Sequence, residues 1–396
     1  MKIIRTVFVC LFLGAVVIPL TFLDRNSFMS ILERRVLANP PRAFDAGQLN
    51  IDLLKSLPRQ IDMYVTDRFA FRSRLIVLMN NINFFVLHKS HDNKMLVGKD
   101  RWLFYIDKSL GDEFANFKKS NLFNKAQMQI FLEHFTLVNN FCRKNGIEFI
   151  FLIVPDKATV YPEKYPFPRP GGLSLVEQII NALPEDQRNK IIFPLDYLIA
   201  MKKESKYPLY YNNGLHWTRA AAYSTFELLY RKLKAAFPGL PVLEFVFTPY
   251  MDKGEDNYAE LWGLKKFGEF MELVNVEPFD GWGSHYRYIL SEDVPLYDYN
   301  RPEAVAALKG KYGMITENAN NNLPAAVVIR DSYFVSLEPF VSSIFSKVEY
   351  IWTQPQKRNL EYLEQLPQKP DVFIWEIGER GLEAIPLVRP GEFPYD

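Results

Sequence analysis

Apolar runs of strand length alternate with amphipathic helical patterns through much of the chain. Ile147 to Val154 forms a run of the kind that strands buried on both faces require. Before it, Lys125 to Arg143 carries apolar residues at helical spacing, and Asn145-Gly146 is a typical helix stop. This pattern predicts a helix followed by a buried strand.

The same alternation continues to residue 377 and predicts an α/β fold, with a parallel sheet covered by helices on both faces. The exception is Pro238–Asn322, the least regular region, which is rich in Gly, Asp, Asn and aromatic residues. The further predicted strands are Ile191–Leu195, Ala325–Ile329, Val348–Trp352 and Val372–Ile377, and the further predicted helices are Leu175–Leu183, Arg219–Ala236, Pro339–Phe345 and Arg358–Leu366.

The N-terminus has the pattern of a membrane anchor. Lys2 and Arg5 precede an apolar run from Thr6 to Leu23, which at about 18 residues is at the short end of what spans a bilayer. No small-x-small cleavage site follows, which favours an uncleaved anchor over a removed signal peptide or a buried soluble helix. The basic residues before the run predict a cytoplasmic N-terminus and an external remainder.

Three segments follow from these patterns. Residues 1–23 are the predicted transmembrane signal anchor, and residues 24–94, polar and without a strong strand signal, are a predicted helical stalk or subdomain. Residues 95–396 form the predicted α/β domain, with an irregular insertion at about 238–322.

Composition narrows the function classes. Lysine plus arginine number 47 and aspartate plus glutamate 46, so a net charge of +1 argues against a nucleic-acid partner. The two cysteines, Cys10 and Cys142, are too few for a disulfide framework or a cysteine zinc site. No glycine-rich phosphate loop is present. We therefore expect no metal and no nucleotide cofactor.

Three polar clusters are predicted near the carboxyl ends of strands, where α/β sheets bind ligands. They are Pro155-Asp156-Lys157 with Tyr161 close behind, Asn212 to Thr218, and Arg330-Asp331-Ser332-Tyr333. A serine on a strand-to-helix turn presents its hydroxyl beside free backbone N–H groups, as acyl-transfer nucleophiles require. Spacing alone favours a helix cap for Ser332 and a structural role for His216 over catalytic roles.

Several motifs occur in the order typical of one family. Met95 to Tyr105 reads MLVGKDRWLFY, Val154 to Lys157 reads VPDK with YPE at Tyr161 to Glu163, and His216-Trp217-Thr218 follows. Arg330-Asp331-Ser332-Tyr333 then stands where a serine-bearing turn is expected. Together these motifs resemble the alginate O-acetyltransferases of the AlgJ/AlgX type. The N-terminal ERRVLA (Glu33 to Ala38) and the closing Pro370 to Arg380 fit the same family.

This resemblance implies an SGNH-hydrolase-like fold and a place in alginate or other exopolysaccharide biosynthesis. It implies a single-pass protein of the bacterial inner membrane, whose periplasmic domain acetylates an exported polysaccharide or cell-envelope glycan. Ser332 would be the nucleophile and His216 the base, with the Ser332 N–H in the oxyanion hole and no cofactor. A membrane-bound O-acyltransferase would supply the acetyl groups.

One residue departs from the family pattern. The aspartate expected two residues before His216 is replaced by Gly214. Such an aspartate orients the histidine, and its loss costs about 10⁴ in rate in a serine triad. Asn213 or a backbone carbonyl, or Asp331 or Asp156 from another loop, could substitute for it. Alternatively, the protein is an impaired enzyme that retains polysaccharide binding or assembly.

Other side chains near the three clusters are candidates for binding substrate. Lys157 and Arg330 suit a uronate carboxylate, and arginine in particular offers a bidentate geometry. Trp217 suits a sugar ring, and Asp331, Tyr333, Asn213 and Tyr161 are further oxyanion or substrate-binding candidates. The same residues would also serve a carbohydrate esterase, in which water is the acceptor. A Glu376/Glu379 glycosidase pair is a further reading.

Overall fold

The computed structural model divides the chain into two compact units. One comprises residues 1–91 and 257–269, and the other residues 92–256 and 270–396. The described residues are 5–9, 12–14, 17, 23, 29–30, 35–45, 48–87, 89, 95–106, 108, 111–252, 271–279, 281, 285–289, 313–352, 363–364, 366 and 368–387.

The first unit is mainly helical. Helix α2 (Ile51–Arg68) begins at Asn50, whose side-chain oxygen accepts from the N–H groups of Asp52 and Leu53. Helix α3 (Arg72–Asn81) continues into the π-helical turn η1 (Ile82–Val86). The short hairpins β1–β2 (Met29–Ser30, Arg35–Val36) and β3–β4 (Phe44–Asp45, Gln48–Leu49) add strands that the polar pattern of residues 24–94 does not predict.

The anchor predicted for residues 1–23 lies largely outside the described residues. Within it, residues 5–9, 12–14 and 17 are helical. Nowhere in the described part of the chain is there a helix both long and apolar enough to cross a membrane.

The second unit is built on a mixed seven-stranded sheet, ordered β11-β12-β14-β13-β15-β7-β8. Strands β14 (Lys347–Trp352), β13 (Ala325–Arg330), β15 (Val372–Gly378), β7 (Glu148–Val154) and β8 (Ile191–Ile192) are parallel, as predicted. Strands β12 (Gly313–Glu317) and β11 (Arg287–Ile289) extend one edge in antiparallel orientation, which corrects the prediction of a purely parallel sheet.

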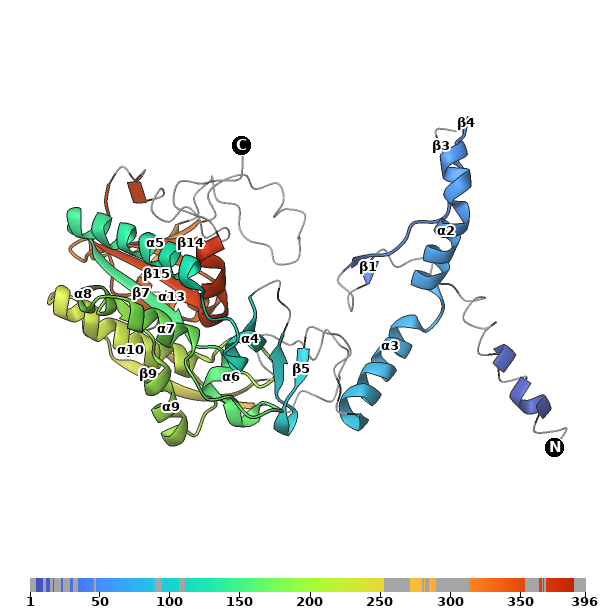
Figure 1. The fold of residues 1–396 in the computed structure, drawn as a ribbon, viewed down its shortest axis with the longest axis horizontal. Coiled ribbons are helices and arrows are strands. Elements are labelled where there is room, and N and C mark those ends of the chain that lie inside the picture. Colours follow the sequence, from blue (N-terminus) through green and yellow to red (C-terminus); the bar gives the residue numbers. More distant parts are fainter. Residues whose placement is uncertain are drawn as a thin grey trace. The chain divides into compact units, whose positions relative to one another are not determined.

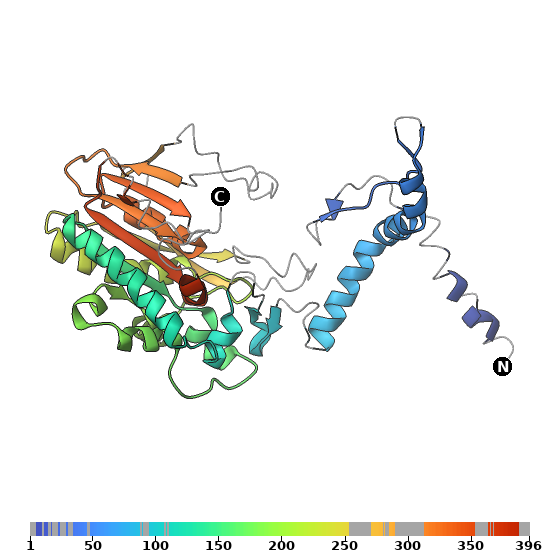
Figure 2. The ribbon, with the colours of Figure 1, turned by 45° about the horizontal axis from the view of Figure 1, so that its top comes forward.

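Helices pack on both faces of this sheet, as Figures 1 and 2 show. Alternate residues of β7 point to opposite faces, which is the period-two geometry of a strand. Ile150 and Leu152 belong to a core that includes side chains of α10 (Arg219–Ala236) and α13 (Glu338–Ser342). Phe149 and Phe151 belong to a second core with α5 (Lys125–Lys144) and α7 (Leu175–Ala182).

The region predicted to be irregular contains regular structure. Strands β9 (Phe245–Asp252) and β10 (Met271–Pro278) form an antiparallel pair, and Leu273, Val274 and Val276 are buried. Pro249 within β9 weakens the strand pattern in the sequence, because proline is rare inside strands. Most of the helix predicted at Arg358–Leu366 lies outside the described residues.

Shorter elements complete the second unit. They are the hairpin β5–β6 (Met95–Val97, Leu103–Tyr105), the helices α4 (Glu113–Lys118), α6 (Lys157–Val160), α8 (Glu185–Arg188) and α9 (Leu195–Glu204), and the 3₁₀ turns η2 (Lys99–Arg101), η3 (Pro162–Lys164), η5 (Ser332–Ser336) and η7 (Glu379–Leu387).

Candidate active site

The serine turn follows directly from strand β13. Asp331 comes after the last residue of the strand, and Ser332 is the first residue of η5. The Asp331 carboxylate accepts hydrogen bonds from the N–H of Tyr333 and the N–H of Gly378, each at 2.8 Å. Asp331 therefore both caps the turn and ties it to the end of β15.

The histidine lies in the segment that leads into α10. Tyr210 and Trp217 form an isolated antiparallel bridge, and the N–H of Tyr211 donates to the His216 carbonyl at 3.2 Å. Thr218 directly precedes the first residue of α10, and its hydroxyl donates to the Pro208 carbonyl at 2.8 Å. The bridge holds His216 in a tight hairpin-like turn.

The structure brings the two predicted catalytic side chains into contact. His216 Nε2 lies 2.7 Å from Ser332 Oγ. For the hydroxyl to donate, Nε2 must be unprotonated, so the ring proton is on Nδ1. Both residues are partly exposed, whereas Trp217 and Tyr333 beside them are fully buried. This geometry allows His216 to take the hydroxyl proton as a general base.

The residues next to the pair connect the two segments. Trp217 Nε1 donates to the Tyr333 carbonyl at 2.9 Å, and the Tyr333 hydroxyl donates to the Leu215 carbonyl at 3.1 Å. The Tyr333 ring also meets His216 edge-on, with ring centroids 5.1 Å apart. Since its side chain is buried and its N–H is held by Asp331, Tyr333 supports the site instead of binding the oxyanion or substrate.

Lys157 is a buried cation that holds the histidine segment. Its Nζ donates to the carbonyl of Tyr211 at 3.1 Å and also to the carbonyl of Gly214. The side chain is fully buried and faces the ring of Phe104 at 5.1 Å. The expectation that Lys157 binds a uronate is therefore wrong, because its charge is directed at backbone carbonyls inside the protein.

Two aromatic candidates are also structural. Trp217 is fully buried, so it is not placed to stack on a sugar ring. Tyr161 is nearly buried, and its hydroxyl accepts from the N–H of Leu209 at 2.9 Å; burial raises the pKa of this hydroxyl to about 12. Asn213 is buried in the turn that precedes His216.

Arg330 differs from the other candidates because it lies two residues before Ser332 and forms an ion pair with Glu338. Its Nη2 lies 2.6 Å from Glu338 Oε1, and its guanidinium faces the ring of Trp352 at 4.9 Å. Burial raises the pKa of the Glu338 carboxyl to about 7, against the opposing effect of the Arg330 charge. With 13% of its side chain exposed, Arg330 remains the candidate best placed to meet an anionic substrate.

A buried group of charged residues below the site was not expected from the sequence. Glu376 Oε2 accepts from the N–H of Asp331 at 2.8 Å, and Glu379 Oε2 accepts from the N–H of Asp156 at 3.0 Å. The two glutamates thus hold separate turns and are not a glycosidase pair. Burial raises the pKa of both carboxyls. Charged residues within and directly after an apolar strand, as in Glu376 to Arg380, are the signal that could have revealed them.

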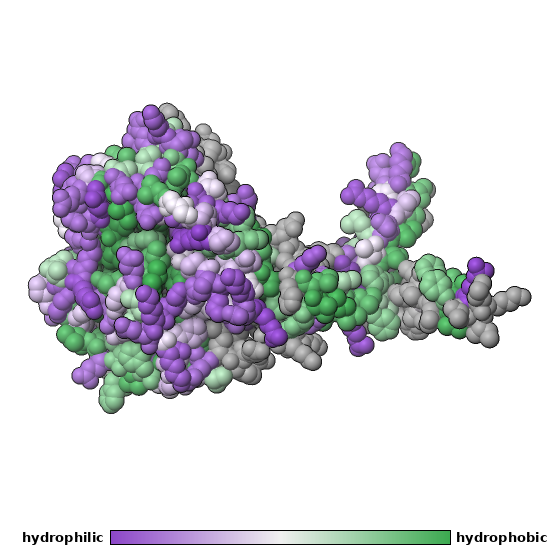
Figure 3. Space-filling view, turned by 60° about the horizontal axis from the view of Figure 1, so that its bottom comes forward, coloured by the Kyte–Doolittle hydropathy of each residue, from purple (hydrophilic) through white to green (hydrophobic). Residues whose placement is uncertain are grey.

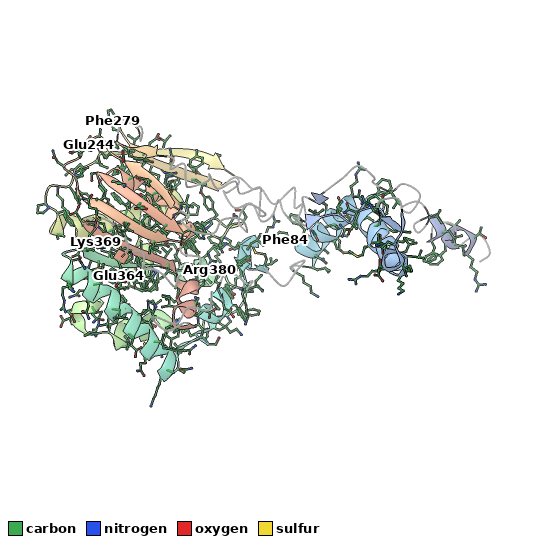
Figure 4. The ribbon with its side chains drawn as sticks, turned by 90° about the horizontal axis from the view of Figure 1, so that it is seen from above. Phe84, Glu244, Phe279, Glu364, Lys369 and Arg380 are labelled. Atoms are coloured by element: carbon green, nitrogen blue, oxygen red, sulfur yellow. The ribbon has the colours of Figure 1, made fainter. Side chains whose placement is uncertain are left out.

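Arg380 connects this buried group to the serine turn. Its guanidinium lies over the Tyr333 ring at 5.1 Å from the centroid, and its Nη1 is 3.7 Å from Glu113 Oε2. Burial, followed by the charge of Asp156, raises the pKa of Glu113. Figure 4 labels Arg380 beyond the end of the sheet strands.

The two aspartates considered as replacements at Gly214 are engaged elsewhere. Both oxygens of Asp331 bind backbone N–H groups, so it points away from the histidine, as expected when Ser332 points in. Asp156 is fully buried, and its Oδ2 accepts from Asn116 Nδ2 at 2.9 Å. Within the described residues, no group of His, Cys, Asp and Glu side chains is arranged to hold a metal ion.

Comparisons with known proteins agree with the motifs. Residues 95–279 match the family described as SGNH hydrolase-like domain, acetyltransferase AlgX. This range contains Lys157 and His216 but ends before Ser332. The fold brings the Ser332 side chain into contact with His216. No curated protein matches the chain.

Solved structures that are similar to this chain include three bacterial proteins. The structure of Bacillus cereus PatB1 with a sulfonyl adduct has 15% identity and a TM-score of 0.50, covering 73% of this chain and 97% of that one. The O-acetyltransferase domain of Pseudomonas putida AlgJ has 16% identity and a TM-score of 0.43, covering 74% and 93%. Pseudomonas aeruginosa AlgX has 13% identity and a TM-score of 0.34, covering 77% and 68%.

The predicted resemblance to the AlgJ/AlgX type is confirmed by the family match, and the predicted enzyme class is the one that the matching family names. Residues 95–279 of this chain are similar to the family described as SGNH hydrolase-like domain, acetyltransferase AlgX.

Proposed function

We propose that this protein transfers acetyl groups to hydroxyls of an exported polysaccharide or cell-envelope glycan through an acetyl-serine intermediate on Ser332. The observation that carries the proposal is the 2.7 Å contact between His216 Nε2 and Ser332 Oγ. This distance supports proton transfer from the proposed nucleophile to the proposed base, and His216 lies within residues 95–279, which match the acetyltransferase family.

In the first half-reaction, Ser332 Oγ attacks the acetyl carbonyl carbon of the donor while His216 Nε2 takes the hydroxyl proton. The bond between the acetyl carbon and the donor's leaving group then breaks, and His216 returns the proton to that group. Because the Tyr333 N–H already donates to Asp331, we assign the Ser332 N–H to the developing oxyanion.

In the second half-reaction, a glycan hydroxyl attacks the acetyl-serine carbonyl and His216 takes its proton. The Ser332 ester bond breaks, the acetyl group leaves on the glycan, and His216 returns the proton to Ser332. Arg330, paired with Glu338 beside the turn, would meet an anionic sugar if the acceptor carries one.

The location of the protein is part of the same proposal. Lys2 and Arg5 before the apolar run support a single-pass anchor in the bacterial inner membrane with the catalytic domain in the periplasm. Acetyl donors are made in the cytoplasm, so a periplasmic site needs a membrane-bound O-acyltransferase partner to deliver acetyl groups. Association of the full chain with such a protein in membranes would test this part independently.

The chemistry is tested by incubating the full chain, in detergent, with an activated acetyl ester and mapping acetylation by peptide mass spectrometry. We expect an acetyl group on Ser332 that is absent in Ser332→Ala and strongly reduced in His216→Ala. Ser336→Ala, in the same turn, is the matched control and should label normally. A folded wild-type protein without a Ser332 label would refute the acetyl-serine mechanism.

Release of acetate with and without a glycan acceptor then separates the two enzyme classes. A transferase moves the acetyl group to the glycan, whereas a carbohydrate esterase releases acetate to water at the same rate without it. Gly214 favours a third outcome, an impaired enzyme that binds polysaccharide, and glycan binding by an unlabelled protein would support that outcome.

A further inference from the structure

One face of the helix formed by α3 and η1 is apolar and exposed. The exposed side chains are those of Phe71, Leu75, Leu78, Met79, Ile82 and Val86, each at least 40% accessible. Leu75, Leu78, Met79 and Ile82, spaced three and four residues apart, lie in one stripe along the helix. Phe71 precedes this stripe at the N-cap of α3, and Val86 follows it at the end of η1. On the other side of the helix, Asn80 and Phe84 are buried, and Figure 4 labels Phe84.

The charged residues in the sequence of this segment all have one sign. Between Asp67 and Asp92 the sequence contains four basic residues and no acidic residue. At 100° per residue, Arg72 and Arg74 lie on either side of the stripe. Arg74 also contacts Phe71, with its guanidinium 5.9 Å from the ring centroid. A helix with an apolar stripe bordered by arginines is typical of segments that lie in a membrane interface.

The length of the segment decides how it would lie. Residues 75–87 form its longest stretch without a charged residue. At 1.5 Å per residue, this stretch is about 20 Å long, which is too short to cross a hydrocarbon core of about 30 Å. Figure 3 shows apolar surface on this segment. It therefore suits the surface of a bilayer and not its full thickness.

We propose that the Phe71–Val86 stripe docks on the surface of an anionic lipid bilayer, with Arg72 and Arg74 at the lipid phosphates. A second copy of the chain fits less well, because it would bring these arginines near equal charges without an acidic partner. The stripe is also wider than a two-helix seam, since Leu78 and Met79 are both exposed. The inference does not depend on the acetyl-serine chemistry, and its test does not measure that chemistry.

The test places a fluorescent label at two positions of the full chain in vesicles of phosphatidylcholine and phosphatidylglycerol. Cys10→Ala removes one thiol, and Cys142 is fully buried, with its pKa raised by burial to about 12, so it does not react in the folded protein. Met79→Cys places the label in the stripe, and Ser73→Cys, about 120° away on the helix, is the matched control. Leu78→Cys replaces Met79→Cys if that variant does not fold.

We expect nitroxide-labelled lipids to quench the label at residue 79 several-fold more than the label at residue 73. The difference should shrink in pure phosphatidylcholine and in the double variant Arg72→Gln/Arg74→Gln. Equal quenching at both positions would overturn the proposal. So would a residue 79 label that is shielded from both lipid and aqueous quenchers, because that result would mean that the stripe packs against protein.

Discussion

The indole N–H of Trp217 donates to the main-chain carbonyl of Tyr333 at 2.9 Å. Each of these residues directly follows one member of the Ser332–His216 pair in the sequence. The bond therefore joins the two segments that carry the pair, one residue away from the reacting atoms and in a fully buried environment. The spacing of the pair is held by neighbours that never touch substrate.

Trp217→Phe should weaken both the fold and the reaction. The variant keeps an aromatic ring but removes the donor to Tyr333, which costs about 1–2 kcal/mol. We expect kcat to fall on the order of tenfold with little change in KM, because the Ser332–His216 distance is no longer fixed. Trp375→Phe is the control, since Trp375 is also fully buried and its Nε1 has no hydrogen-bond partner in the described structure. Equal effects in the two variants would contradict this role.

Lys157→Met should destabilise the protein strongly. It removes a buried cation from the carbonyls of Tyr211 and Gly214, and we expect a loss of about 3 kcal/mol, visible as a lower urea midpoint. Lys206→Met is the comparison, because Lys206 forms an exposed pair with Glu272 and its loss should lower the urea midpoint much less. Similar midpoints for the two variants would show that Lys157 does not hold the histidine segment.

Glu338 should make stability fall as pH rises. Burial raises its pKa to about 7 in the folded protein, from 4.5 in the unfolded chain. Between these values the folded state keeps a proton that the unfolded state has lost, so rising pH favours unfolding. The loss is on the order of 3 kcal/mol from this group across that window.

Urea denaturation at pH 5 and pH 8 measures this effect. Glu338→Gln should reduce the pH dependence of the free energy of unfolding, whereas Glu185→Gln, at an exposed position, should leave it unchanged. An unchanged pH dependence in Glu338→Gln would rule out Glu338 as its source.

Gly378→Ala should disturb the serine turn from the strand beside it. A Cβ at residue 378 would lie 3.2 Å from Asp331 Oδ2 and 3.2 Å from the Tyr333 ring. Since such contacts are tight, we expect a loss of about 1–3 kcal/mol and a lower kcat. Gly171→Ala, where no atom lies within 4 Å, should leave thermal stability and kcat unchanged. Normal kcat in Gly378→Ala would mean that the turn adapts without loss.

The sequence was sufficient to predict most of the central sheet and the meeting of Ser332 with His216. Apolar runs such as Ile147–Val154 mark buried strands directly, because both faces of each strand are covered. The antiparallel strands β11 and β12 were missed, because strands of three and five residues are too short to show such a run. The positions of the serine and the histidine could be predicted because Ser332 follows the predicted strand Ala325–Ile329 and His216 precedes the predicted helix Arg219–Ala236.

The supporting roles of Lys157, Glu376 and Glu379 could not be predicted. These roles depend on the position of β15 between β13 and β7. The order of strands in a sheet cannot be predicted from the residue pattern of a single strand. Lys157 was therefore read as a substrate-binding residue, although the fold directs its charge inward. A charged residue near a site looks the same in the sequence whether it binds substrate or supports the fold.

The position of β15 also affects the order in which the protein is built. Of the seven sheet strands it is the last to be synthesised, yet it pairs with β13 on one side and β7 on the other. A growing chain therefore cannot join the two halves of its sheet until residues 372–378 have emerged. Until then, two apolar strands stay without their shared neighbour, and the nascent chain depends on protection from aggregation.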